Sequence, residues 1–125
     1  MAKKIKSKKK IYGLELVLEV FGCDLNLLKS KRKLQEYLIE VSRIVKLERY
    51  GPSQIKRFMG GGLWDEGYSF FQFLTTSSIT GHCLEPDRLV FVNVFSCSIF
   101  NPKKAEDFTK KFFRAKKIKS KLIIH

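Results

Sequence analysis

Residues 11–24 read IYGLELVLEVFGCD, and apolar side chains occupy every second position along the first part of this stretch. The alternating positions are Leu14, Leu16, Leu18 and Val20. Because successive side chains of a strand point to opposite faces of a sheet, this period of two predicts a β-strand over residues 11–21 with one buried face. The Gly22-Cys23-Asp24 sequence that follows is typical of a turn and ends the strand.

A period of three and four residues follows the turn and indicates a helix. Between about residues 29 and 46, basic and acidic residues separate the apolar ones, which are Leu34, Tyr37, Leu38, Val41, Ile44 and Val45. This spacing predicts an amphipathic helix. A second helix should open at Asn101-Pro102, because proline is favoured in the first turn of a helix. Its inner face would carry Ala105, Phe108, Phe112 and Phe113.

The remaining segments predict strands and connections. Residues 68–75 and 89–97 are rich in aromatic and β-branched side chains, which favour strands. Weaker patterns predict a strand over residues 47–58, followed by a glycine loop at 60–62, and a last strand over 118–124. Residues 76–88 contain Gly81 and Pro86 and therefore predict a connection. The order of these strands and helices along the chain predicts an α/β (α+β) fold, a two-layer sandwich of a mainly antiparallel sheet with two helices on one face.

Length and composition agree with one folded domain. The chain has 125 residues, 44% of them hydrophobic and 13% aromatic, which is too apolar for a disordered protein. We expect a basic flexible arm over residues 1–10 and a single domain over 11–125. No apolar run approaches the roughly 20 residues that cross a bilayer, and no signal peptide opens the chain, so a soluble, cytoplasmic protein without membrane partners is expected.

The cysteines, histidines and charged residues limit which cofactors and partners the protein could have. Three cysteines without paired spacing and two histidines indicate neither a disulfide framework nor a metal site. The net charge of +13 is concentrated near the two ends of the chain, where 13 of the 25 basic residues lie. They are Lys3, Lys4, Lys6, Lys8, Lys9 and Lys10, then Lys110, Lys111, Arg114, Lys116, Lys117, Lys119 and Lys121. Solvated tails and helix faces account for such clusters, and charge alone leaves only a weak case for a nucleic-acid partner.

Hydroxyl, imidazole and thiol groups gather in and after the predicted connection at 76–88, but each is ambiguous alone. Thr75, Thr76, Ser77 and Ser78 would usually be a polar loop whose hydroxyls bond to the backbone. His82 beside Gly81 is typical of a turn. A cysteine at the end of an apolar strand, such as Cys97, is ordinarily a small buried hydrophobe.

Four stretches are informative in combination: GLELVLEVFGCD at 13–24, GYSF at 67–70, TSSITGH at 76–82 and VNVFSC at 92–97. In order and spacing they resemble the bacterial and archaeal S-adenosylmethionine decarboxylases, small pyruvoyl enzymes made as a proenzyme. The family motifs they resemble are an opening strand ending in Cys-Asp, a Gly-Val-Ser-Gly segment, a Glu-Ser-His-Ile-Ser-Ile-His cleavage segment and a Val-Asp-Val-Phe-Thr-Cys strand. The likeness spans about residues 11–118, and the interval of 15 from His82 to Cys97 is the family's own.

The resemblance implies a chemistry for the polar cluster. The chain would cut itself between Thr76 and Ser77, and Ser77 would become a pyruvoyl group that forms a Schiff base with the substrate. Ser69 and His82 match the family's processing residues, His82 as the base of the elimination. Cys97 matches the proton donor of the decarboxylation. The pyruvoyl group would be the only cofactor, with no metal, and the resemblance also implies a homodimer with sites near the subunit contact.

The chain departs from the family's pattern around the expected substrate site. Thr76 replaces the glutamate before the cleavage serine, and Ser78 replaces the histidine after it. The carboxylate expected to bind a ribose hydroxyl is shifted by one position to Glu85. The aromatic residue expected to stack on adenine falls at Leu63, with Trp64 adjacent, so Glu85 and Trp64 are the candidate substrate-binding residues.

Three hypotheses follow. The first is decarboxylation of S-adenosylmethionine, which supplies the aminopropyl donor for polyamine (spermidine) synthesis. The second keeps the pyruvoyl chemistry but uses arginine or ornithine, whose cationic groups could meet Asp65, Glu66 and Glu85. The third is a non-catalytic, basic binding protein that retained the fold and lost the reaction.

Overall fold

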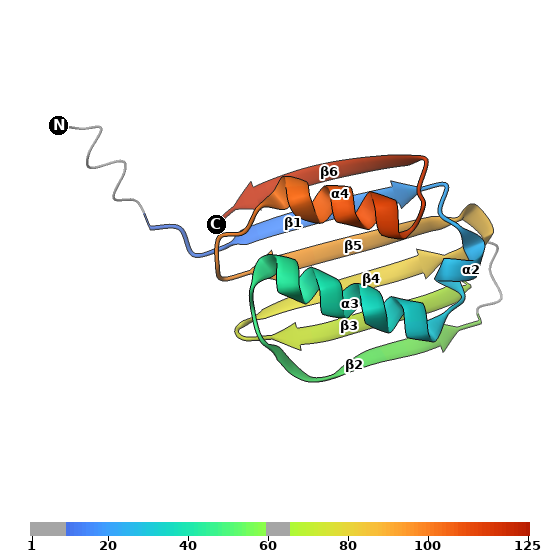
Figure 1. Cartoon of the computed structure of the whole chain (residues 1–125), viewed down its shortest axis with the longest axis horizontal. Helices are drawn as coiled ribbons and strands as arrows, with labels where there is room; N and C mark the ends of the chain where they lie inside the picture. Colours follow the sequence, from blue (N-terminus) through green and yellow to red (C-terminus); the bar gives the residue numbers. More distant parts are fainter. Residues whose placement is uncertain (1–9, 60–65) are drawn as a thin grey trace.

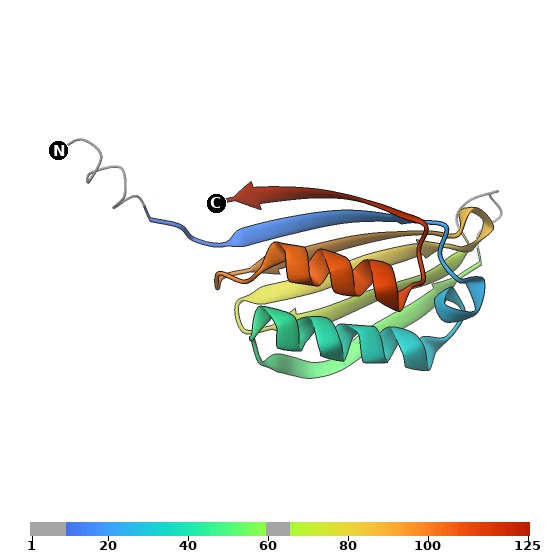
Figure 2. The same cartoon turned by 45° about the horizontal axis from the view of Figure 1, so that its top comes forward.

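The computed structural model describes residues 10–59 and 66–125, in which six antiparallel strands form one sheet (Figure 1). The strand order across the sheet is β2-β3-β4-β5-β1-β6. The strands are β1 (Leu14–Phe21), β2 (Arg49–Phe58), β3 (Gly67–Leu74), β4 (Ser77–Leu84), β5 (Leu89–Ser96) and β6 (Lys117–Ile124). Helices α2 (Leu25–Leu28), α3 (Lys31–Val45) and α4 (Pro102–Phe112) lie on one side of this sheet (Figure 2). The predicted fold class is confirmed.

Side-chain caps fix where the two long helices begin. Ser30 precedes α3 and its Oγ accepts a hydrogen bond from the backbone N–H of Lys33 at 3.2 Å. Asn101 precedes α4 and accepts from the N–H of Lys104 at 3.1 Å, with Pro102 in the first turn. Such caps satisfy backbone donors that have no partner within the helix. The short helix α2, capped by Asp24, was not predicted, because four residues are too few for a helical period to be recognised.

The core lies between the helices and the sheet. Leu14, Leu16, Leu18 and Val20 of β1 all face the helices and are at most 5% exposed, as the alternation predicted. Tyr37 of α3 is fully buried at the centre, and its hydroxyl is 2.8 Å from Oγ1 of Thr109 in α4. The rings of Phe70, Phe108, Phe112 and Phe113 surround Tyr37 with centroid distances of 4.9–6.0 Å. Burial of each large apolar side chain contributes about 1.5–3 kcal/mol.

The prediction of a connection over residues 76–88 is wrong. Residues Ser77–Leu84 form β4 in the middle of the sheet, Glu85–Asp87 form a short 3-10 helix, and the β3–β4 loop is reduced to Thr75 and Thr76. Gly81, which suggested a turn, lies within the strand opposite Phe70. A glycine is required there because the ring of Phe70 occupies the space that a side chain would need. A Cβ on Gly81 would stand 2.0 Å from a ring atom of Phe70.

The opposite side of the sheet carries no helix among the described residues, and we call it the open face. Its side chains come from alternate positions of every strand, and they include Phe71 and Phe73 of β3, Thr80 and His82 of β4, Phe91 and Phe95 of β5 and Glu15 of β1. Phe73 is 51% exposed and Phe91 38% exposed. Lysines follow one edge of this face along β6. In the described ranges, no helix has the length and hydropathy of a membrane span.

Candidate functional site

The tight turn between β3 and β4 holds the bond predicted to be cut. Leu74 and Ser77 pair across the end of the β3–β4 ladder, so only Thr75 and Thr76 form the loop. Thr76 has a positive φ of 47°, which is unusual for a β-branched residue. Ser77 is nearly buried, at 9% exposure, and its Oγ accepts a hydrogen bond of 2.8 Å from the backbone N–H of Cys97. The hydroxyl predicted to be the nucleophile is therefore fixed next to the end of β5.

Cys97 completes this cluster, and unlike an ordinary structural cysteine it is exposed. The Oγ1 of Thr76 donates to its Sγ at 3.0 Å. The hydroxyl of Thr76, and after it that of Ser77, lowers the pKa of the Cys97 thiol below its usual value. Cys23 and Cys83 are buried instead, and loss of solvent raises the pKa of each to about 12. Of the three thiols, Cys97 is the one whose surroundings favour chemistry.

Ser69 and His82 form a second cluster. They are direct neighbours across the β3–β4 ladder, and Oγ of Ser69 lies 2.8 Å from Nδ1 of His82. Both face a pocket of about 660 Å³ on the open face, which Phe58 and Phe71 also line. The structure brings together the two residues that the family resemblance assigned to processing.

The two clusters are separate within one chain. His82 lies five residues beyond Ser77 on β4, which is about 16 Å along a strand. The burial of β4 alternates, so Ser77 points towards the helix side of the sheet while His82 points to the open face. A single chain therefore gives Ser77 and Cys97 no contact with Ser69 and His82.

An aromatic pocket adjoins the predicted cleavage bond. Thr76 and Ser77 line it together with Ser78, Leu74 and three phenylalanines, Phe71, Phe73 and Phe95, and it holds about 420 Å³. The rings of Phe71 and Phe73 meet edge to face with centroids 4.5 Å apart. Aromatic walls of this kind can stack on a planar group or a cation.

The candidate substrate-binding residues lie elsewhere. Glu85 follows β4 at its far end and is 5% exposed, and both of its carboxylate oxygens accept hydrogen bonds from Arg57 of β2. Arg57 also donates to Glu66 at 3.0 Å, and these carboxylates, Glu85 above all, raise the pKa of the guanidinium above its usual value. Three residues of the expected substrate site lie outside the described residues. They are Leu63, at the position expected to stack on adenine, and its neighbours Trp64 and Asp65. Sequence reasoning missed Arg57, because 28 residues separate it from Glu85 and no local pattern joins them.

A third polar cluster on the open face was also missed. Glu15 of β1 accepts hydrogen bonds from Asn93 of β5 at 2.8 Å and pairs with Nε2 of His125 at 2.9 Å. The amide of Asn93 first, and then His125, lowers the pKa of Glu15 below its usual value. Glu15 stands opposite Phe95 in the sheet register, so this carboxylate lies beside the aromatic pocket. Two acidic residues at outward positions of this strand, Glu15 and Glu19, were the available signal, but the sequence alone does not separate them.

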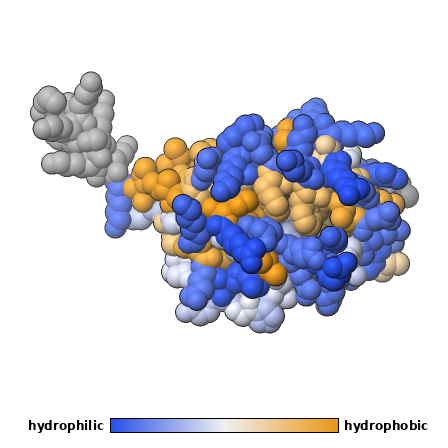
Figure 3. Space-filling model, viewed as in Figure 1, coloured by the Kyte–Doolittle hydropathy of each residue, from blue (hydrophilic) through white to orange (hydrophobic). Residues whose placement is uncertain are grey.

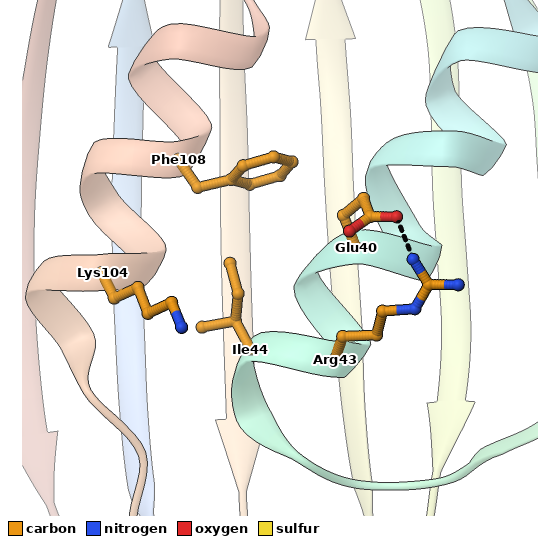
Figure 4. Close-up of a pocket in the computed structure, with 5 residues that line it drawn as sticks. All are labelled: Glu40, Arg43, Ile44, Lys104 and Phe108. Carbon is orange, nitrogen blue, oxygen red and sulfur yellow. Dashed lines mark hydrogen bonds and ion pairs between the residues drawn. The ribbon is translucent and has the colours of Figure 1, made fainter.

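The helix side of the molecule offers a different kind of surface. Hydrophilic residues dominate it, with hydrophobic residues visible between them (Figure 3). A groove between α3 and α4 has Ile44 and Phe108 at its centre, with Lys104 on one side and the Glu40–Arg43 ion pair on the other (Figure 4). None of the residues predicted for the site lines this groove. In the described part of the chain, His, Cys, Asp and Glu side chains nowhere form a group of three that could hold a metal ion.

Comparison with known proteins assigns the chain to a family. The sequence model described as S-adenosylmethionine decarboxylase matches residues 14–124, which is most of the chain. The S-adenosylmethionine decarboxylase proenzyme of Clostridium botulinum strain Hall is 29% identical over 116 residues, covering 92% of this chain and 95% of the relative. The proenzyme of strain Okra of the same species is 28% identical over the same length, with the same coverage. The recognition made from sequence motifs is confirmed, and with it the prediction of a decarboxylase-class enzyme.

A solved structure has the same fold. The adenosylmethionine decarboxylase of Aquifex aeolicus VF5 superposes with a TM-score of 0.75, covering 92% of this chain and 91% of that one. Sequence identity between the two is 19%, so this likeness concerns the fold.

Proposed function

Because the chain belongs to the S-adenosylmethionine decarboxylase family, we propose that it is a pyruvoyl-dependent decarboxylase of S-adenosylmethionine, activated by self-cleavage between Thr76 and Ser77. The product would be the aminopropyl donor for spermidine synthesis. The observation that carries the proposal is the turn itself, in which the Ser77 hydroxyl is fixed by the N–H of Cys97 at the start of β4.

The chain's own residues support the cleavage step. Attack of Ser77 Oγ on the carbonyl carbon of Thr76 would move the acyl group from nitrogen to oxygen and give an ester. Removal of the Cα proton of residue 77 would then expel the Thr76 carboxylate and leave dehydroalanine, and water would replace its nitrogen as ammonia. Thr75 and Thr76 lie at the surface, so water has access to the turn. The residues present fit a pyruvoyl group, since Ser77, its proposed precursor, is nearly buried and Cys97 lies beside it.

Decarboxylation needs an electron acceptor and a proton donor. The pyruvoyl carbonyl would supply the electron acceptor. Cys97 would return the proton, because its thiol is exposed, adjoins residue 77, and is held by the hydroxyl of Thr76. The aromatic pocket of Phe71, Phe73 and Phe95 is the surface against which an adenosyl group could stack.

We also propose a homodimer, because one chain separates Ser77 from Ser69 and His82. If two open faces stack about 10 Å apart, a two-fold axis that crosses the strands at the level of Thr80 exchanges the two ends of β4. His82 of the partner subunit would then face Ser78, the neighbour of Ser77. Exposed Phe73 and Phe91 support burial of this face against a second copy. Glu85, held by Arg57, remains a proposed substrate-binding residue.

Denaturing electrophoresis and mass spectrometry of the purified protein test the cleavage. The expected result is two fragments, residues 1–76 and 77–125, the second beginning with a carbonyl in place of an amine. Ser77→Ala should give only the intact chain, whereas Ser120→Ala, a serine of β6 bonded to Glu106 away from the turn, should still cleave. An intact wild-type chain after long incubation would instead favour the non-catalytic basic binding protein.

Release of carbon dioxide from carboxyl-labelled compounds tests the substrate. We expect release from S-adenosylmethionine, with little from arginine or ornithine. The carboxylates of Glu66 and Glu85 argue against a guanidinium substrate at that position, because Arg57 already binds both. Faster release from arginine or ornithine would establish the alternative that keeps the same chemistry.

A further inference from the structure

Thr76 adopts a backbone conformation that its side chain disfavours. Four non-glycine residues in the described ranges have positive φ, namely Lys46 at 60°, Thr76 at 47°, Arg88 at 49° and Arg114 at 51°. In the left-handed region the Cβ of an L-residue crowds the following carbonyl oxygen, and a β-branched side chain increases the crowding. Thr76 alone among these four is β-branched, and its carbonyl belongs to the bond proposed to be cut.

Contacts on both sides hold Thr76 in this conformation. The backbone N–H of Thr75 donates to the carbonyl of Glu48 at 3.1 Å, and Oγ1 of Thr76 is 2.8 Å from the carbonyl oxygen of Thr75. Ser77 is fixed on the other side by its pairing with Leu74 and by the N–H of Cys97. A strained residue persists only where its surroundings determine its conformation, and this turn meets that condition.

We propose that Thr76 is a positioning residue for self-cleavage, because its branched side chain raises the free energy of the intact turn and breaking the Thr76–Ser77 amide lowers it again. The inference rests on the proposed function. In the ester, two atoms rather than one separate the carbonyl carbon of Thr76 from Cα of residue 77, so the turn is lengthened and Thr76 can leave the left-handed region. The strain thus favours the ester over the amide.

The size of the effect follows from the conformational preference. Release of left-handed strain should speed cleavage by about 5–30-fold, which corresponds to about 1–2 kcal/mol. Replacing Thr76 by glycine, which adopts positive φ without strain, should therefore slow cleavage by that factor. The hydroxyl of Thr76 also touches Cys97, so its contribution must be separated from that of the branch.

Pulse-labelled full-length chain from cell-free translation gives the cleavage rate directly on denaturing gels. We expect Thr76→Gly to slow cleavage about 5–30-fold, and Thr76→Ser, which keeps the hydroxyl but loses the branch, to slow it by a smaller factor. Thr76→Val keeps the branch without the hydroxyl and should cleave within about twofold of wild type. Arg114→Gly relieves a left-handed residue that pairs with Asp24 at the other end of the sheet, and it should leave the rate unchanged.

The outcomes distinguish this inference from the proposed function. Cleavage of Thr76→Gly at the wild-type rate would overturn the strain argument while leaving self-cleavage intact, as would equal slowing of Thr76→Val and Thr76→Gly. Equal slowing of Arg114→Gly would also overturn it, since the effect would then belong to general stability. Absence of wild-type cleavage would refute the proposed function and this inference together. Thermal unfolding of each unprocessed chain, expected no lower than wild type for Thr76→Gly, checks that slow cleavage is not misfolding.

Discussion

Ser77 and His82 lie on the same strand but on opposite faces of the sheet, five residues apart. Ser77 is held by the backbone of Cys97, whereas His82 is bonded to Ser69. No rotation of side chains brings them into contact, because about 16 Å of strand separates them. A reaction that uses both must therefore draw on two chains or on a large rearrangement of β4, and the central position of β4 in the sheet argues against the rearrangement.

Mixing two inactive variants tests whether the site is shared. Ser77→Ala and His82→Ala should each fail to cleave alone. When unfolded together and refolded, half of the dimers would be mixed, and the His82→Ala chain in each would meet an intact His82 of the partner subunit. About a quarter of all chains should then cleave, as fragment quantitation would show.

A second pair of variants serves as the control for this mixing experiment. Cys97 and Ser77 contact each other within one chain, so mixing Ser77→Ala with Cys97→Ala should not restore decarboxylation. Complete absence of fragments from the Ser77→Ala and His82→Ala mixture, with dimers present by size-exclusion chromatography, contradicts the shared site.

Alkylation as a function of pH tests the environment of Cys97. A lowered thiol pKa means that a larger fraction is thiolate at any pH below the ordinary value, so iodoacetamide should label Cys97 of uncleaved His82→Ala chain at neutral pH. Cys23 and Cys83, whose pKa values are raised to about 12 by burial, should remain unlabelled. Adding Thr76→Val removes the hydroxyl that lowers this pKa most, so the labelling curve should shift to higher pH. An unchanged curve, measured by peptide mass spectrometry, refutes the role of Thr76.

Removing Arg57 should destabilise the fold. Arg57→Met leaves Glu85, which is 5% exposed, as an uncompensated buried charge, and the expected loss in free energy of unfolding is about 2–4 kcal/mol. Urea titration measures it. Arg43→Met is the control, since its partner Glu40 lies on the exposed surface of α3 and the loss should be under about 1 kcal/mol. The Arg57→Met/Glu85→Met double variant should recover part of the loss, and equal stability of Arg57→Met and wild type would contradict the buried pair.

Gly81→Ala tests why β4 contains a glycine. The new Cβ would stand 2.0 Å from the ring of Phe70, so we expect a loss of about 1–3 kcal/mol in urea titration. Phe70→Leu removes the ring and should make Gly81→Ala less costly in the double variant than in the wild-type background. Strictly additive losses in the double variant would mean that the ring of Phe70 is not the reason why position 81 requires glycine.

The elements with a strong local period were predictable, whereas β4 and the short helix α2 were not. The alternation from Leu14 to Val20 and the helical spacing from Leu34 to Val45 are properties of adjacent residues, and both elements formed where expected. β4 reads Ser-Ser-Ile-Thr-Gly-His-Cys-Leu, which has little strand preference of its own. Its ladders with β3 and β5 determine its conformation, and those contacts are not visible in a short window of sequence.

The contacts of the candidate site also divide into those that the sequence predicted and those that it did not. The Ser69–His82 and Ser77–Cys97 contacts join residues that a family spacing had already singled out. The Arg57–Glu85 pair joins distant residues on elements whose faces had to be known first. The separation of the two clusters was also hidden, because a loop at 76–88 has no defined faces, whereas a strand assigns odd and even positions to opposite sides.

The strand order has a consequence for the mature protein. Cutting between residues 76 and 77 would leave β1, β2 and β3 on one piece and β4, β5 and β6 on the other, with β1 inserted between β5 and β6. Three antiparallel ladders, β3–β4, β5–β1 and β1–β6, would still tie the pieces together. Among the described residues each piece keeps one ladder of its own, β2–β3 or β4–β5, and a two-stranded ribbon is at best marginally stable alone. The cleaved molecule should therefore remain one folded unit, and both fragments should unfold in the same melting transition.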